Sequence, residues 1–160
     1  MNLDFASVWE MISDIVPEND ALICGDEIIS WKDYDLQSSK IATALKNAGL
    51  GPNSKAGLYL NNSNEYLIGQ NAIFKIGGVP INVNYRYVAE ELIYLLDNSD
   101  SEAVFYHACY SSRIKEISGS LPNIKAWIEI ADGTKSEFED SLKFEELLDS
   151  CDPMERIHRD

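Results

Sequence analysis

The sequence predicts an α/β fold in which an open, doubly wound parallel sheet follows an N-terminal helix and a β-hairpin. Four short apolar runs indicate the sheet, because their first residues lie 24, 23 and 23 positions apart. Intervals of that length leave room for a helix but not for a hairpin, so neighbouring strands should run parallel through right-handed crossovers. The four predicted strands cover residues 55–60, 79–83, 102–106 and 125–130.

Two amphipathic helices are predicted in the first third of the chain. Apolar side chains recur at helical spacing over residues 5–16, where Asp4 can cap the helix and Pro17 forbids its continuation. A second helix should run over residues 32–47 and end at Gly49, a residue type suited to a left-handed helix cap.

A hairpin should separate these two helices. Two β-like runs at 21–24 and 27–31 flank Gly25-Asp26, a pair whose positive backbone angles suit a tight turn. The later strands alternate with segments of helical periodicity. The apolar residues that indicate those later helices are Leu67, Ala72, Ile73 and Phe74, then Val88, Leu92, Leu95 and Leu96, then Ile114 and Ile117, and finally Phe144, Leu147 and Leu148.

Two polar segments lack such periodicity. Residues 132–143 are expected to form a surface excursion. Residues 152–160 have no apolar period and resemble a connection to a part of the protein outside this sequence.

Composition narrows the class of protein. The 160 residues suit one domain, and 13 Lys and Arg against 27 Asp and Glu give a formal net charge of -14 at pH 7. That charge repels phosphate backbones, so no nucleic-acid partner is expected. The cysteines, Cys24, Cys109 and Cys151, are widely spaced and favour neither a disulfide framework nor a zinc site. Because no apolar run is long enough for a transmembrane segment and no basic leader precedes one, a cytoplasmic protein is expected.

Arg86 is the main candidate for ligand binding. It lies in the segment 84–87, Asn-Tyr-Arg-Tyr, directly after the predicted strand at 79–83. Ligands of open parallel sheets bind beyond the carboxyl ends of the strands, where a planar guanidinium can contact a phosphate. The alternative is a local ion pair with Glu90 or Glu91.

Other polar residues near this edge are weaker candidates. Arg113 and Lys115 should begin the next helix, and they can add positive charge near Arg86 if the loops converge. His107 and Cys109 have the spacing of a ligand pair but no third ligand, so no metal site is predicted.

The glycine and asparagine clusters favour structural roles. Gly77-Gly78 fits a helix terminus, since no Lys-Ser/Thr follows as in a P-loop. The segment 49–51, Gly-Leu-Gly, follows a helix and no GxGxxG completes it. Residues 61–64 are expected to cap a helix. Because no Ser-His-Asp or Cys-His constellation is present, no catalytic residue is predicted.

The order of three segments resembles the adenylate-forming enzymes. ISWKDYDLQSSKIATAL (29–45), LYLNNSNEYL (58–67) and KIGGVPINVNYRYVAEELIYLLDNSDSEAVFYH (75–107) follow that superfamily's order and approximate distances. The resemblance is closest to acyl-CoA synthetases, the fatty-acid-type acid–thiol ligases, and covers nearly all of the chain. It implies that residues 1–160 are an N-terminal fragment, the first subdomain of the large N-terminal domain of such an enzyme.

The resemblance also implies a reaction. Acyl-CoA synthetases use ATP and Mg2+ to convert a carboxylic acid to an acyl-adenylate, release pyrophosphate, and transfer the acyl group to coenzyme A (CoA). Their phosphate loop ending in Pro-Lys, their adenine and ribose contacts and their C-terminal lysine lie downstream, and none of these motifs occurs in the 160 residues. The fragment alone is therefore expected to be inactive and to bind none of these cofactors tightly.

The same resemblance assigns site residues. Arg86 matches an arginine that follows this strand in some CoA ligases and contacts the phosphates of CoA, and Arg113 is a second candidate. The sequence GGVPINVNYRY is more similar to acyl-CoA synthetases than to amino-acid adenylation domains, which typically carry a Pro-Leu-Asp variant. Such a domain, or a free-standing binding or regulatory module without catalysis, remains an alternative. A subdomain cut from a larger core exposes apolar faces, so homo-oligomers are a further expectation.

Overall fold

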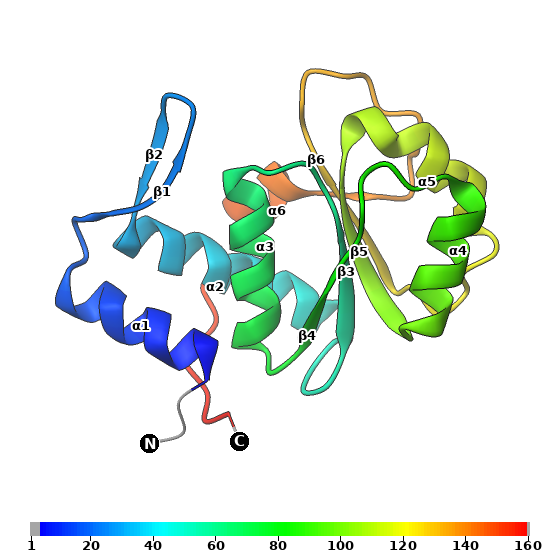
Figure 1. Cartoon of the computed structure of the whole chain (residues 1–160). Helices are drawn as coiled ribbons and strands as arrows, with labels where there is room; N and C mark the ends of the chain where they lie inside the picture. The colour runs from blue at the N-terminus through cyan, green and yellow to red at the C-terminus, as the bar shows by residue number, and fades with distance from the viewer. Residues whose placement is uncertain (1–3, 160) are drawn as a thin grey trace.

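The computed structural model describes residues 4–159 and contains a five-stranded parallel sheet with helices on both faces (Figure 1). The strand order is β4-β3-β5-β6-β7, and every neighbouring pair is parallel. The predicted α/β class and the four predicted strands are confirmed. The strands are β3 (Lys55–Tyr59), β4 (Val79–Asn82), β5 (Ser101–His107), β6 (Ala126–Ile130) and β7 (Leu142–Lys143).

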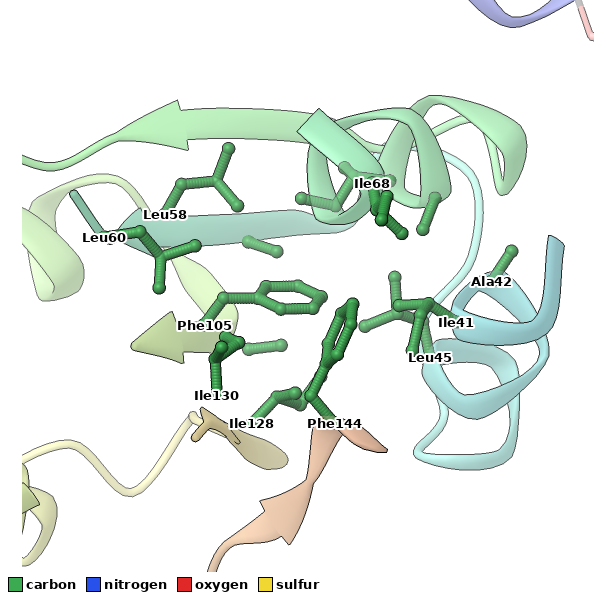
Figure 2. Close-up of a cluster of buried hydrophobic side chains, with 14 of the residues drawn as sticks. Ile41, Ala42, Leu45, Leu58, Leu60, Ile68, Phe105, Ile128, Ile130 and Phe144 are labelled. Atoms are coloured by element: carbon green, nitrogen blue, oxygen red, sulfur yellow. The ribbon is translucent and has the colours of Figure 1, made fainter. Parts of the chain in front are cut away.

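Two hydrophobic clusters lie on opposite faces of this sheet, because alternate side chains of a strand point in opposite directions. On one face, Phe105 of β5 and Ile128 of β6 pack in one cluster with Phe144, as Figure 2 shows. On the other face, Val104 and Tyr106 pack in the second cluster. The first face is covered by α2 (Trp31–Asn47), α3 (Asn64–Lys75) and α6 (Phe144–Ser150), and the second by α4 (Ala89–Asn98) and α5 (Ser111–Ser118).

The N-terminal helix and hairpin form where they were predicted. Asp4 caps α1, since its Oδ1 accepts a hydrogen bond of 2.9 Å from the backbone N–H of Ser7. In the hairpin turn only Gly25, with φ of 60°, has a positive φ, so the expectation of positive angles at both turn residues was wrong for Asp26. These elements are α1 (Phe5–Ile15), β1 (Asp20–Cys24) and β2 (Glu27–Ser30).

The Gly77-Gly78 pair ends a helix, as predicted, and is not a ligand cradle. Gly77 has φ of 73°, and the N–H of Gly78 donates to the carbonyl of Ile73 over 2.9 Å, which closes the end of α3. A Cβ on Gly78 would lie 2.8 Å from the carbonyl oxygen of Ser54. The second glycine is therefore required because the backbone that leads into β4 lies close to Ser54, the residue before β3.

The polar segment 132–143 is more than the surface excursion that was expected. Leu142 pairs with Ile128 and begins β7, and Phe138 is buried against Trp127 with ring centroids 6.1 Å apart. A two-residue strand is too short to produce a period in the sequence, and a single buried phenylalanine produces none either. Both features depend on contacts with β6 that only the folded chain provides.

The C-terminal segment 152–159, which was predicted to connect to a part of the protein outside this sequence, packs against the domain. The N–H of Met154 donates to the carbonyl of Ser39 over 3.0 Å. Arg159 is only 7% exposed and forms ion pairs with Asp4 and Glu10 of the N-terminal helix region. Figure 1 shows this segment beside α1. Ion pairs, a backbone hydrogen bond and one partly buried apolar residue, Met154, hold the segment in place, so no apolar period could predict its position.

No helix within residues 4–159 is long and apolar enough to cross a membrane.

Candidate functional site

The loop after β4 forms a tight turn that presents Arg86. The N–H of Tyr87 donates to the carbonyl of Asn84 over 3.0 Å, and the N–H of Arg86 donates to Oδ1 of Asn84, also over 3.0 Å. An asparagine at the first position of a turn commonly makes this side-chain bond to the backbone two residues later. Arg86 therefore occupies the third position of the turn, at the carboxyl edge of the sheet.

The side chain of Arg86 is exposed and available to a ligand. Its Cζ lies 5.5 Å from the centroid of the Tyr85 ring, a cation–π contact. No hydrogen bond or ion pair to its guanidinium occurs among residues 4–159, so the alternative of pairing with Glu90 or Glu91 does not hold there. Glu91 instead accepts the N–H of Val88 over 3.0 Å and caps α4.

Arg113 extends from α5 and contacts the same loop. The Arg86 turn and the start of α5 therefore lie close together, which was the condition for Arg113 to add positive charge near Arg86. Its Nη1 donates to the hydroxyl of Tyr59 over 2.6 Å and to the carbonyl of Tyr87 over 2.8 Å. The Tyr59 hydroxyl donates to the same carbonyl over 3.2 Å. Burial raises the pKa of Tyr59, while Arg113 opposes this shift. Arg113 is partly buried, and these two bonds direct it toward the protein.

Three further residues, Tyr110, Asn61 and His107, extend the contacts of Arg113, Tyr59 and Tyr87 to the neighbouring loops. The ring of Tyr110, in the short 3-10 helix η1 (Ala108–Tyr110), lies 4.7 Å from that of Tyr59, and its hydroxyl donates to Oδ1 of Asn61 over 3.0 Å. The N–H of Asn61 donates to Nδ1 of His107 over 3.3 Å. Burial lowers the pKa of His107, which favours the neutral ring that this acceptor role needs. The loops after β3, β4 and β5 are thus joined by one cluster, in which two sets of hydrogen bonds meet at the ring contact between Tyr59 and Tyr110.

Two members of this cluster, Tyr59 and Tyr110, were not predicted from the sequence. Tyr59 is the last residue of β3 and reads as one more buried strand residue, and Tyr110 reads as part of a loop. A polar hydroxyl at the very end of a buried strand was the one available signal, because a buried tyrosine hydroxyl usually needs a hydrogen-bond partner.

His107 and Cys109 are not brought together with a third His, Cys, Asp or Glu ligand among residues 4–159. Cys109 is exposed, and its backbone N–H donates to Oδ2 of Asp132 over 3.0 Å. Partial burial and the neighbouring Asp132 raise the pKa of the Cys109 thiol to about 11. Within the described part of the chain, no three His, Cys, Asp or Glu side chains are placed to hold a metal ion.

The remaining predicted residues have structural or peripheral positions. Oγ of Ser63 accepts the N–H of Tyr66 over 3.3 Å, so the expected capping role of residues 61–64 is confirmed at Ser63. Lys115 lies exposed on α5, and the structure does not join it to the Arg86 turn.

Comparison with known proteins identifies the family. Residues 13–158 match the model of the AMP-binding enzyme family. The chain belongs to this family. The predicted resemblance to adenylate-forming enzymes is therefore confirmed.

Several curated relatives of this AMP-binding enzyme chain are named as CoA ligases. A protein of Mycobacterium marinum, named medium/long-chain-fatty-acid–CoA/3-oxocholest-4-en-26-oate–CoA ligase, is 37% identical over 136 residues, which cover 85% of this chain and 25% of that protein. The 3-oxocholest-4-en-26-oate–CoA ligase of Rhodococcus rhodochrous is 33% identical over 155 residues, which cover 96% of this chain and 28% of the relative. The chain thus spans between a quarter and three-tenths of the length of these relatives.

Solved structures of the family share the fold. An anthranilate CoA ligase in complex with anthranoyl-AMP superposes with a TM-score of 0.86 at 19% identity, over 96% of this chain and 29% of that one. A fatty acyl CoA synthetase of Mycobacterium tuberculosis superposes with a TM-score of 0.78 at 21% identity, over 92% of this chain and 28% of that one.

Proposed function

We propose that this chain is the N-terminal subdomain, residues 1–160, of an ATP-dependent acyl-CoA synthetase that acts on medium- or long-chain fatty acids. The name of the Mycobacterium marinum relative supports both the reaction class and the fatty acid, and the name of the Rhodococcus rhodochrous relative supports the reaction class. The observation that supports a direct contribution by this chain is the exposed guanidinium of Arg86 at the carboxyl edge of the sheet.

The proposed reaction has two steps. The carboxylate of the acid attacks the α-phosphorus of ATP, which forms an acyl-adenylate and releases pyrophosphate. The sulfur of CoA then attacks the acyl carbonyl, which forms the thioester and releases AMP, while the thiol proton passes to solvent or a base. When bound, Mg2+ would neutralise charge on the ATP phosphates. We assign no Mg2+ ligand and no catalytic residue to residues 4–159.

Arg86 is suited to contact a phosphate of CoA. Its guanidinium presents N–H groups in a planar fork that matches phosphate oxygens, and none of these N–H groups donates to a residue within 4–159. The chain carries a formal net charge of -14, which repels an anion such as CoA at long range. A local cation that is not neutralised by a carboxylate is therefore needed where CoA binds.

The Arg86→Ala variant tests this contact in the native polypeptide that contains the chain. A lost charge-assisted hydrogen bond of about 1.5–3 kcal/mol should raise the KM for CoA about tenfold or more, with the KM for ATP unchanged. The matched control is Lys115→Ala, which removes one exposed positive charge from α5 without touching the turn. An unchanged KM for CoA in Arg86→Ala would refute the assignment.

One competing function has a specific observation behind it. A linear gramicidin synthase protein of Brevibacillus parabrevis is 30% identical over 95 residues, which cover 59% of this chain and 2% of that protein. An amino-acid adenylation domain would deliver its product to the thiol of a carrier protein. Supplying the adenylate with either CoA or a carrier protein separates the two functions, and we expect transfer to CoA. A native protein that binds CoA without any turnover would instead indicate a binding or regulatory module.

Three further properties belong to the same proposal. The isolated 160 residues should show no ATP- and CoA-dependent turnover and no tight binding of either compound. A reducing cytoplasm suits the three cysteines, which are all free thiols. Exposed apolar side chains of α1 and the hairpin should promote homo-oligomers of the isolated chain, which sedimentation would detect; a monomer at high concentration would contradict this. These side chains are Phe5, Ile15, Ile23 and Ile28.

A further inference from the structure

We propose that Arg113 is a positioning residue that fixes the Arg86 turn, and not a second phosphate-binding arginine. This inference rests on the proposed role of Arg86 in CoA binding. It concerns the clamp formed by Arg113, Tyr59 and the carbonyl of Tyr87, which the sequence did not predict.

The clamp holds the turn on the carboxyl side of Arg86. Two donors, Nη1 of Arg113 at 2.8 Å and the hydroxyl of Tyr59 at 3.2 Å, converge on the carbonyl oxygen of Tyr87. A carbonyl oxygen has two lone pairs, so both are occupied. On the amino side, Oδ1 of Asn84 holds the N–H of Arg86. The backbone around Arg86 is therefore fixed on both sides, while its guanidinium stays exposed.

The clamp is attached to rigid parts of the fold. Tyr59 is fully buried at the end of β3, in the interior of the sheet, and its ring packs against Tyr110. Arg113 comes from α5, whose Ile114 and Ile117 are buried in the core. A turn fixed in this way loses less conformational freedom when Arg86 engages a phosphate, which strengthens binding without any added contact.

Direct phosphate binding through Nη1 of Arg113 would disrupt this arrangement. That nitrogen already donates to Tyr59 over 2.6 Å and to Tyr87 over 2.8 Å. Withdrawing it would leave the Tyr87 carbonyl with one donor and the Tyr59 hydroxyl without its cationic neighbour. Nη1 of Arg113 is therefore engaged by the fold, whereas no N–H of the Arg86 guanidinium donates to a residue within 4–159.

A double-mutant cycle in the native polypeptide separates positioning from direct contact. Arg113→Ala should raise the KM for CoA about three- to tenfold in the wild-type background and less than about twofold when Arg86 is already alanine, since contacting residues are coupled and independent ones are not. Equal factors in both backgrounds would show independent phosphate contact and overturn the proposal. The rate of acid-dependent ATP–pyrophosphate exchange, which needs no CoA, should change much less than the KM for CoA, and an equal loss there would overturn the proposal.

Two further measurements keep the test decisive. Tyr59→Phe removes the hydroxyl but keeps the ring, and it should raise the KM for CoA only when Arg86 is present. Both Arg113→Ala and Tyr59→Phe should increase the hydrogen–deuterium exchange of the backbone amides of residues 85–88. This readout does not depend on enzyme activity. Unchanged exchange would refute the clamp. If Arg86→Ala alone leaves the KM for CoA unchanged, the proposed function itself is refuted. That outcome differs from equal effects of Arg113→Ala in the two backgrounds, which refute only the positioning role.

Discussion

Lys75 is the centre of a buried ionic network, and its replacement gives the most quantitative stability prediction. Its Nζ lies 2.8 Å from Oε1 of Glu10 and 2.6 Å from Oδ1 of Asp35, and its side chain is 1% exposed. The network joins α1, α2 and α3, and through the second carboxylate oxygen of Glu10 it reaches Arg159 of the C-terminal segment. Lys75→Met keeps most of the side-chain volume and removes the charge.

The expected loss follows from what remains after the substitution. Removing one partner of a buried ion pair costs about 3–5 kcal/mol, because the other charge stays buried without compensation. Here Glu10 keeps Arg159, and Asp35 keeps Arg156 at 3.4 Å, so we expect the lower end, about 3 kcal/mol. With a urea m-value of about 2 kcal/mol/M, the unfolding midpoint should fall by about 1.5 M.

The matched control is Lys55→Met, because Lys55 forms an exposed ion pair. Its Nζ lies 3.0 Å from Asp100, and the two side chains are 36% and 82% exposed. Exposed pairs contribute about 0–1 kcal/mol, so its midpoint should hardly change. Urea unfolding followed by circular dichroism measures both variants. A Lys75→Met loss no larger than that of Lys55→Met would refute the claim that the network stabilises the fold.

Two other predictions concern the Gly-Gly turn and the Cys109 thiol. Gly78→Ala should lower the free energy of unfolding by about 1–3 kcal/mol through overpacking, since its Cβ would lie 2.8 Å from the carbonyl oxygen of Ser54. The control Gly119→Ala places its Cβ where no atom lies within 4 Å, so it should change the free energy of unfolding by less than about 0.5 kcal/mol. Urea unfolding measures both variants, and equal effects would contradict the packing argument. Because the pKa of the Cys109 thiol is raised to about 11, its thiolate fraction at pH 8 is about 0.1%. Iodoacetamide should therefore modify Cys109 much more slowly than a cysteine whose thiol has its ordinary pKa. Asp132→Asn removes the neighbouring carboxylate and should speed the alkylation measured by mass spectrometry, and an unchanged rate would count against the assigned cause.

The sequence was most informative where one local pattern decided the structure. The equal spacing of apolar runs predicted a parallel sheet, and Gly49 and Gly77 marked helix ends that the fold confirms with φ of 88° and 73°. Asp4 was identified as a cap from its position alone. Such features depend on a few neighbouring residues, so a linear reading captures them.

Long-range polar contacts were not predictable in this way. Arg113 lies 54 positions from Tyr59, and Arg159 lies 149 positions from Glu10. Nothing in the residues around either arginine distinguishes a guanidinium that holds a loop or a tail from a solvated one. The exposed position of Arg86 could be inferred from its place after β4, whereas the clamp behind it required the three-dimensional arrangement.

The most direct test of the proposed function is acyl-CoA formation by the native polypeptide that contains this chain. Purified protein would be incubated with ATP, Mg2+, CoA and a series of fatty acids of increasing length, and products would be measured by mass spectrometry. We predict acyl-CoA and AMP in equal amounts with medium- or long-chain acids, and a strongly reduced yield at low CoA for Arg86→Ala. Absence of any acyl-CoA, or equal yields from both proteins at every CoA concentration, would contradict the proposed function.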